Sequence, residues 1–211
     1  MGLLSLSLIS CNSDDNSNTA TEDDSAGFYA LSEGNQWTYQ YYSRITMTDE
    51  FELVDCSTIV EITGTSQINN ETYFTVETTT TGSDAGSIPC DKNPSGTIRV
   101  RDSLGFLIDS DGAILYSREN TAPYLISENT WGDIYGELLL TSETIEVPAG
   151  TFDCLKLERF AILNDGSMSI GRENEYWSDG IGEVYETYSL VSASDHRWEK
   201  RLVSYDLAST N

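Results

Sequence analysis

Histidine and cysteine, two residue types that often carry out catalysis, are sparse in this chain of 211 residues, and their spacing matches no common catalytic motif. His196 is the only histidine and lies at the start of the last predicted strand. No GxSxG nucleophile elbow occurs. Cys154 could pair with His196 only if the fold brought two distant strands together, and a cysteine on a strand is usually a small core residue. We therefore predict that the chain is not an enzyme and uses no cofactor.

A metal site is the next chemistry to consider. Asp109 and Asp111 occupy the first positions of a D-x-D-G pattern, which begins many calcium loops. The twelfth position of such a loop should be glutamate, but it is Asn120 here. We therefore favour a hairpin turn and keep a weak calcium site as the alternative. Zinc is disfavoured because the chain has no CxxC pair and a single histidine.

The first cysteine follows a short apolar run at 2–9, which is too short to span a bilayer and has the length of a signal-peptide core. The segment 8–11, Leu-Ile-Ser-Cys, resembles the lipobox of bacterial lipoproteins. That resemblance implies that Cys11 becomes the first mature residue and carries diacylglycerol and an N-acyl (palmitate-type) chain. Several chains make such anchoring stable. A buried segment of a cytosolic protein is the alternative.

No lysine or arginine precedes the apolar run, although signal peptides normally begin with positive charge. We therefore expect residues 1–10 to be a truncated signal peptide whose true start lies upstream. Residues 11–26 are polar and acidic and lack aromatic side chains, which predicts a disordered tether. The acidic cluster at 13–15 resembles the surface-export signal of lipoproteins from Bacteroidetes. The resemblance implies an outer-membrane protein facing outward, with a periplasm-facing lipoprotein as the alternative.

Three cysteines remain for an exported protein that encounters an oxidising compartment. Cys56 and Cys90 lie in loop-like contexts, whereas Cys154 lies inside a predicted strand. We therefore hypothesise a Cys56–Cys90 disulfide and a free Cys154.

The charge of the chain excludes one class of partner. It has 35 acidic and 11 basic residues, a formal net charge of −24. A polyanion gains nothing from counterion release on DNA or RNA, so we expect no nucleic-acid partner. Electrostatic attraction to an anionic membrane is disfavoured because the chain is also negatively charged. We therefore expect the protein to associate with a membrane through the lipid on Cys11. We expect a monomer.

The elements that position these residues are predicted to be strands. The segment 36–44 alternates aromatic and polar side chains, and segments 57–66 and 72–80 flank Asn69-Asn70 as a hairpin. About ten short strands follow one another, and no helical stripe occurs. Residues 27–211 therefore read as a single all-β domain with little helix. Its antiparallel sheet should curl into a half-barrel or barrel, with a β-sandwich as the alternative.

Three further motifs carry a family resemblance: LSEGNQWTY at 31–39, EVPAGTF at 146–152 and YWSDGIGEV at 176–184. Together they resemble a group of uncharacterised exported proteins of Gram-negative bacteria. The resemblance implies a curled antiparallel sheet, loosely similar to the half-barrel of the carriers LolA and LolB. It implies no activity.

The function remains open between two non-enzymatic hypotheses. Trp37, Tyr39 and Tyr41 share one strand face and could contact an apolar or glycan ligand, or simply form core. The first hypothesis is a surface lipoprotein that acts as a binding or interaction module. The alternative is a lipid or lipoprotein carrier, or an acceptor of the same type, in envelope biogenesis.

Overall fold

The structure is a computed structural model that describes residues 27–83, 90 and 94–208. The predicted signal segment, the tether and Cys11 lie outside the described residues, as do residues 84–89 and 91–93. Among the residues described, no helix has the length and apolar character needed to cross a membrane.

The described chain forms one antiparallel sheet of 12 strands. The strands are β1 (Gln36–Arg44), β2 (Phe51–Ile68), β3 (Glu71–Thr81), β4 (Gly96–Ser103), β5 (Phe106–Asp109), β6 (Ile114–Ser117), β7 (Tyr124–Asn129), β8 (Gly132–Val147), β9 (Gly150–Leu163), β10 (Glu173–Ser178), β11 (Gly182–Tyr188) and β12 (Trp198–Asp206).

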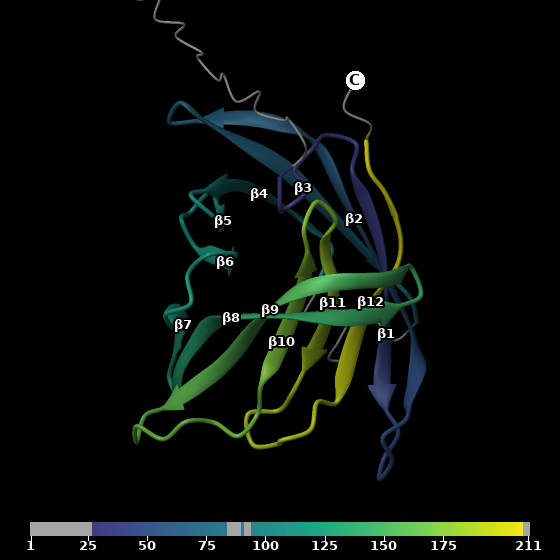
Figure 1. Cartoon of the computed structure of the whole chain (residues 1–211), viewed down its shortest axis with the longest axis vertical. Coiled ribbons are helices and arrows are strands. Elements are labelled where there is room, and N and C mark those ends of the chain that lie inside the picture. The colour runs from purple at the N-terminus through teal and green to yellow at the C-terminus, as the bar shows by residue number, and fades with distance from the viewer. Residues whose placement is uncertain (1–26, 84–89, 91–93, 209–211) are drawn as a thin grey trace, which may run out of the picture.

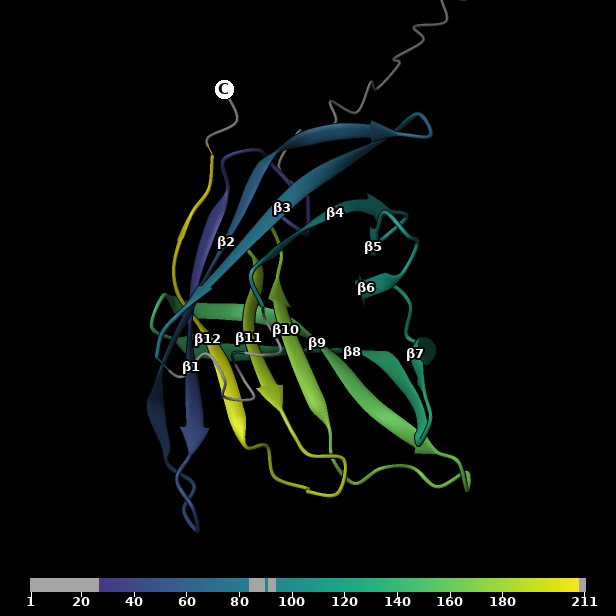
Figure 2. The ribbon, with the colours of Figure 1, turned by 180° about the vertical axis from the view of Figure 1, so that it is seen from behind.

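The strand order is that of a meander whose first and last strands are neighbours. It runs from β6 through β1 and β12 to β7, so β6 and β7 are the two edges. Figures 1 and 2 show the sheet curled until these edges approach one another, which gives a nearly closed barrel. The all-β prediction of a curled antiparallel sheet is confirmed.

Side chains connect the two ends of the sheet through the interior, joining β6 to β9 and β5 to β7. An Arg159 guanidinium nitrogen donates to the Leu115 carbonyl at 3.2 Å, and the Tyr116 hydroxyl donates to the Leu155 carbonyl at 3.3 Å. The Phe106 and Tyr124 rings meet edge to face. We call the boundary between the edge strands β6 and β7 the seam. Aromatic rings are large enough to fill the space at this seam, where the two edges are not paired by backbone hydrogen bonds.

Several local predictions hold. The alternating segment at 36–44 has the bounds of β1, and Trp37, Tyr39 and Tyr41 on its one face are buried. Asn69 and Asn70 both have positive φ, at 51° and 67°, as expected for the two central residues of a type I′ hairpin turn. Asp109 closes the turn between β5 and β6 by accepting the backbone N–H groups of Asp111 and Ala113.

The cysteine prediction is confirmed in its pairing but wrong in one detail. The structure contains the Cys56–Cys90 disulfide, and Cys154 is free and buried inside β9. Cys56, however, lies within β2 rather than in a loop. The five residues of β2 before it, FELVD, place apolar and acidic side chains without strict alternation, and all five are exposed or only partly buried. An exposed strand need not show the apolar alternation from which strands are recognised.

The hairpin of β8 and β9 and the turn before β1 both shape the interior of the barrel. The hairpin of β8 and β9 extends across the neighbouring strands in Figure 1, and Ala149 at its tip donates to the Leu202 carbonyl of β12 at 3.1 Å. The turn before β1 inserts Phe28 and Tyr29 among buried residues of β4, β5, β6, β8 and β9. The Tyr29 hydroxyl donates to the Gly105 carbonyl at 2.6 Å. One part of the interior is therefore filled, and another remains hollow.

Candidate ligand-binding cavity

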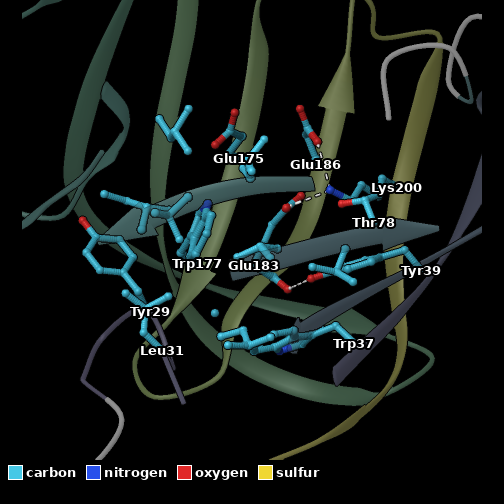
Figure 3. A pocket seen from close by; sticks show the side chains of 18 of the residues that line it. Tyr29, Leu31, Trp37, Tyr39, Thr78, Glu175, Trp177, Glu183, Glu186 and Lys200 are labelled. Carbon is cyan, nitrogen blue, oxygen red and sulfur yellow. Dashed lines mark hydrogen bonds and ion pairs between the residues drawn. The ribbon is translucent and has the colours of Figure 1, made fainter. Parts of the chain in front are cut away.

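The hollow part of the barrel is a cavity of about 480 Å³. This volume lies in the ~300–1,000 Å³ range of small-molecule sites. Its lining comes from nearly every strand between β6 and β9, through β1 and β12 (Figure 3). Because successive residues of a strand face opposite sides of a sheet, each long strand contributes alternate side chains.

One wall of the cavity is apolar and belongs to the first half of the chain. Its aliphatic side chains come from β2, β3, β4, β5, β6 and the turn before β1, and they include Leu31, Val60, Ile62, Val76, Val100 and Leu107. Trp37, Tyr39, Tyr29 and Trp177 add aromatic surface.

Two of these aromatic side chains are fixed by backbone carbonyls at the start of β11 and in the turn before it. The Trp37 indole N–H donates to the Ile181 carbonyl at 2.7 Å, and the Tyr39 hydroxyl donates to the Glu183 carbonyl at 2.9 Å. Gly182 has a φ of 95°, which strongly favours glycine, and lies against the Trp37 ring. The GIG motif of the sequence therefore helps to position the cavity wall.

The opposite wall is charged and comes mainly from β10, β11 and β12. Figure 3 shows Glu175, Glu183, Glu186 and Lys200 directed into the cavity. The Lys200 ammonium binds Glu183 at 2.8 Å and lies 3.6 Å from the Glu186 carboxylate. Arg159 forms an ion pair with Glu175. Burying so many charges is costly, and the pairing offsets only part of that cost.

Burial perturbs the ionisation of this wall. It raises the pKa of Glu175 to about 8, with Arg159 opposing the shift and the Glu186 and Glu183 carboxylates adding to it. Burial also raises the pKa of Glu183, against the attraction of Lys200. The pKa of Lys200 is held well above its ordinary value because Glu183 and Glu186 outweigh its desolvation. Perturbed groups in a cleft are typical of functional sites.

Three buried polar atoms of the lining have no hydrogen-bond partner within the described part of the chain. They are the Trp177 indole nitrogen, one carboxylate oxygen of Glu183 and the Arg159 Nε. A buried polar atom without a partner costs about 1–3 kcal/mol. A ligand that donates to Glu183 and accepts from Trp177 would recover part of that cost.

The aromatic residues of the predicted ligand-facing strand separate into two groups. Trp37 and Tyr39 line the cavity, and whether they contact a ligand stays a prediction. Tyr41 is fully buried, packs with the Cys56–Cys90 disulfide and hydrogen-bonds Thr58 at 2.9 Å. It is not among the residues that line the cavity.

The remaining candidates lie apart from the cavity lining. His196 contacts Glu199 at 2.9 Å and stacks on Phe51. The thiol of Cys154 contacts the Phe152 carbonyl, and burial raises its pKa to about 12. No group of three or more histidine, cysteine or acidic residues that could hold a metal occurs among the residues described. Asp109 and Asp111 therefore have no third acidic, histidine or cysteine side chain beside them, within the described residues, that would complete a calcium site.

Sequence reasoning missed the charged wall entirely. Glu175, Glu183, Glu186 and Lys200 are scattered over three strands, among 35 acidic residues in the chain. The one available signal was the placement of Glu175 and Glu186 in strands, flanked by aromatic residues. Such a signal is weak because it does not say which face of the strand is buried.

Fold and cavity together define a class: an all-β protein whose nearly closed antiparallel sheet encloses a cavity of mixed apolar and charged character. No protein-family model and no curated protein matches the chain. Solved structures do match its fold.

One is a "putative exported protein with YmcC-like fold" from Bacteroides fragilis, with a TM-score of 0.51 and 14% identity, covering 85% of this chain and 99% of that one. Another is a "putative lipoprotein" from Parabacteroides distasonis, with a TM-score of 0.52 and 12% identity, covering 85% and 98%. At these identities the likeness shows the fold alone.

Proposed function

We propose that this protein is a non-enzymatic, lipid-anchored envelope protein that binds one small amphipathic ligand inside its curled sheet. The observation that carries the proposal is the cavity of about 480 Å³, with an apolar wall facing a charged wall that contains unpartnered polar atoms. An apolar cavity with a few convergent polar groups is the usual form of a ligand site.

The test is binding of the neutral apolar fluorophore N-phenyl-1-naphthylamine to the full chain. The variant Thr78→Trp places an indole in the cavity lining, at a residue that is only partly buried. The matched control is Thr79→Trp, because Thr79 is exposed on the same strand. We expect saturable binding with one site in wild type and Thr79→Trp, and a loss of at least tenfold in affinity in Thr78→Trp. Equal binding by both variants would contradict the proposal.

The lipobox-like Cys11 and the acidic segment behind it support a proposed location in the cell envelope, as do structural neighbours described as an exported protein and a lipoprotein. We propose an outer-membrane anchor with the domain facing outward. Protease added to intact cells should then degrade the protein. Degradation only after permeabilisation would place the domain in the periplasm.

A carrier role is the second candidate, and one observation favours it. The edges β6 and β7 are not hydrogen-bonded to each other, so the sheet is closed beside the cavity by side-chain contacts rather than by a backbone ladder. Transfer of a fluorescent fatty-acyl lipid between vesicle populations, accelerated by the protein at catalytic amounts, would support this role. Binding without acceleration would leave the protein as a binding module.

A further inference from the structure

We propose that the cavity selects an amphiphile with a cationic head group, a protonated alkylamine, and holds the ammonium against Glu183 and Glu186. The proposal rests on the proposed ligand-binding function and names its ligand class. Three independent features of the lining support it: the balance of charge, an unused acceptor and the aromatic wall.

The charge balance of the cavity favours a cation. Four glutamates line it, Glu173, Glu175, Glu183 and Glu186, against the two basic residues Arg159 and Lys200, so acidic side chains outnumber basic ones even when Glu175 holds its proton. Both basic side chains are already paired with these carboxylates. An anionic head group would have to displace a glutamate from its partner and leave that carboxylate buried, which is strongly unfavourable.

The unused acceptor lies on Glu183. One oxygen of this carboxylate accepts from Lys200 at 2.8 Å, while the other is buried without a hydrogen-bond partner in the described structure. An ammonium carries N–H donors and positive charge, so it would satisfy the oxygen with a charge-assisted hydrogen bond. A neutral hydroxyl would supply the hydrogen bond without the charge.

The aromatic wall already accommodates a cation. The Lys200 ammonium lies 4.6 Å from the centroid of the Tyr39 ring. Trp37 and Trp177 line the same cavity and present further π surface. Cations are attracted to the faces of such rings, and more strongly when they are desolvated. The aliphatic side chains of β2–β5 would then receive the alkyl chain.

The test compares three amphiphiles of equal chain length by isothermal titration calorimetry on the full chain, each below its micellar concentration. We expect decylamine to bind with one-to-one stoichiometry at least about tenfold more tightly than decanol, and decanoate to bind more weakly than decanol. Because the chain has a net charge of −24, decylamine will also adsorb to the surface. Thr78→Trp should therefore remove the one-to-one phase and leave the weak adsorption.

The variant that isolates the head-group contact is Glu183→Gln, which should abolish the preference for decylamine over decanol while retaining decanol binding. Glu77→Gln, at an exposed position on β3, should keep the preference. Equal affinity for decylamine and decanol in wild type, or tighter decanoate binding, would overturn the inference and leave the proposed function intact. Binding of none of the three would overturn both. The wild-type series decides these outcomes even if Glu183→Gln does not fold.

Discussion

The buried Glu175 predicts that this protein is less stable at alkaline than at mildly acidic pH. An ordinary glutamate has a pKa of 4.5, and burial raises that of Glu175 to about 8. Between these values the folded state holds a proton that the unfolded state has released. Stability from this group is therefore fully present below pH 4.5 and is lost as the pH rises through 8.

The magnitude follows from the two pKa values. A rise from 4.5 to about 8 corresponds to a loss on the order of a few kcal/mol of unfolding free energy, at ~1.4 kcal/mol for each pH unit. Because the Glu175 side chain is only 7% exposed, little solvent screening reduces this contribution. Glu183, whose pKa is also raised, acts in the same direction. Glu199 has a lowered pKa, so its contribution is lost only below pH 4.5.

The assay is urea denaturation of wild type and Glu175→Gln at pH 5.5, 7.0 and 8.5, with the disulfide intact. Glutamine keeps a carbonyl that can accept from Arg159 and cannot ionise. We expect wild type to lose several kcal/mol between pH 5.5 and 8.5, and Glu175→Gln to lose substantially less. The exposed Glu77→Gln serves as the control and should follow wild type. Parallel losses in wild type and Glu175→Gln would refute the assignment of the shift to Glu175.

Three further predictions concern the cysteines. Replacing Cys56 and Cys90 together with serine should lower the free energy of unfolding by about 4 kcal/mol, because the bond spans 34 residues; a loss below 1 kcal/mol in urea denaturation would contradict this. Cys154 should react slowly with iodoacetamide in the folded protein and rapidly in urea, because burial raises its thiol pKa to about 12; fast labelling of the folded protein would argue against a buried thiol. Cys11→Ser should move the protein from the detergent to the aqueous phase of Triton X-114, with Cys154→Ser as the control; unchanged partitioning would exclude lipidation at Cys11.

The fold was predictable where one face of a strand is buried and the turns are chemically distinctive. The alternation at 36–44 and the Asn69-Asn70 turn each located an element correctly. The strand β7 and the first half of β8 were missed. Their segment includes Gly132, Gly136 and many polar side chains, and a short edge strand buries too little to show a pattern.

The candidate site was predictable only in part. Trp37 and Tyr39 could be placed on one face of a strand, and both line the cavity. The sequence could not reveal the charged wall, because Arg159, Glu175 and Lys200 converge only when β9, β10 and β12 curl around one interior. Long-range register and curvature, rather than local pattern, decide which charges are buried together.

Native mass spectrometry of the full chain, extracted from the bacterial envelope and compared with its Thr78→Trp and Thr79→Trp variants, tests the central claim most directly. We predict that wild type and Thr79→Trp carry one bound molecule of constant mass and that Thr78→Trp does not. The bare protein mass in all three, or the same adduct in all three, would contradict a ligand site inside the curled sheet.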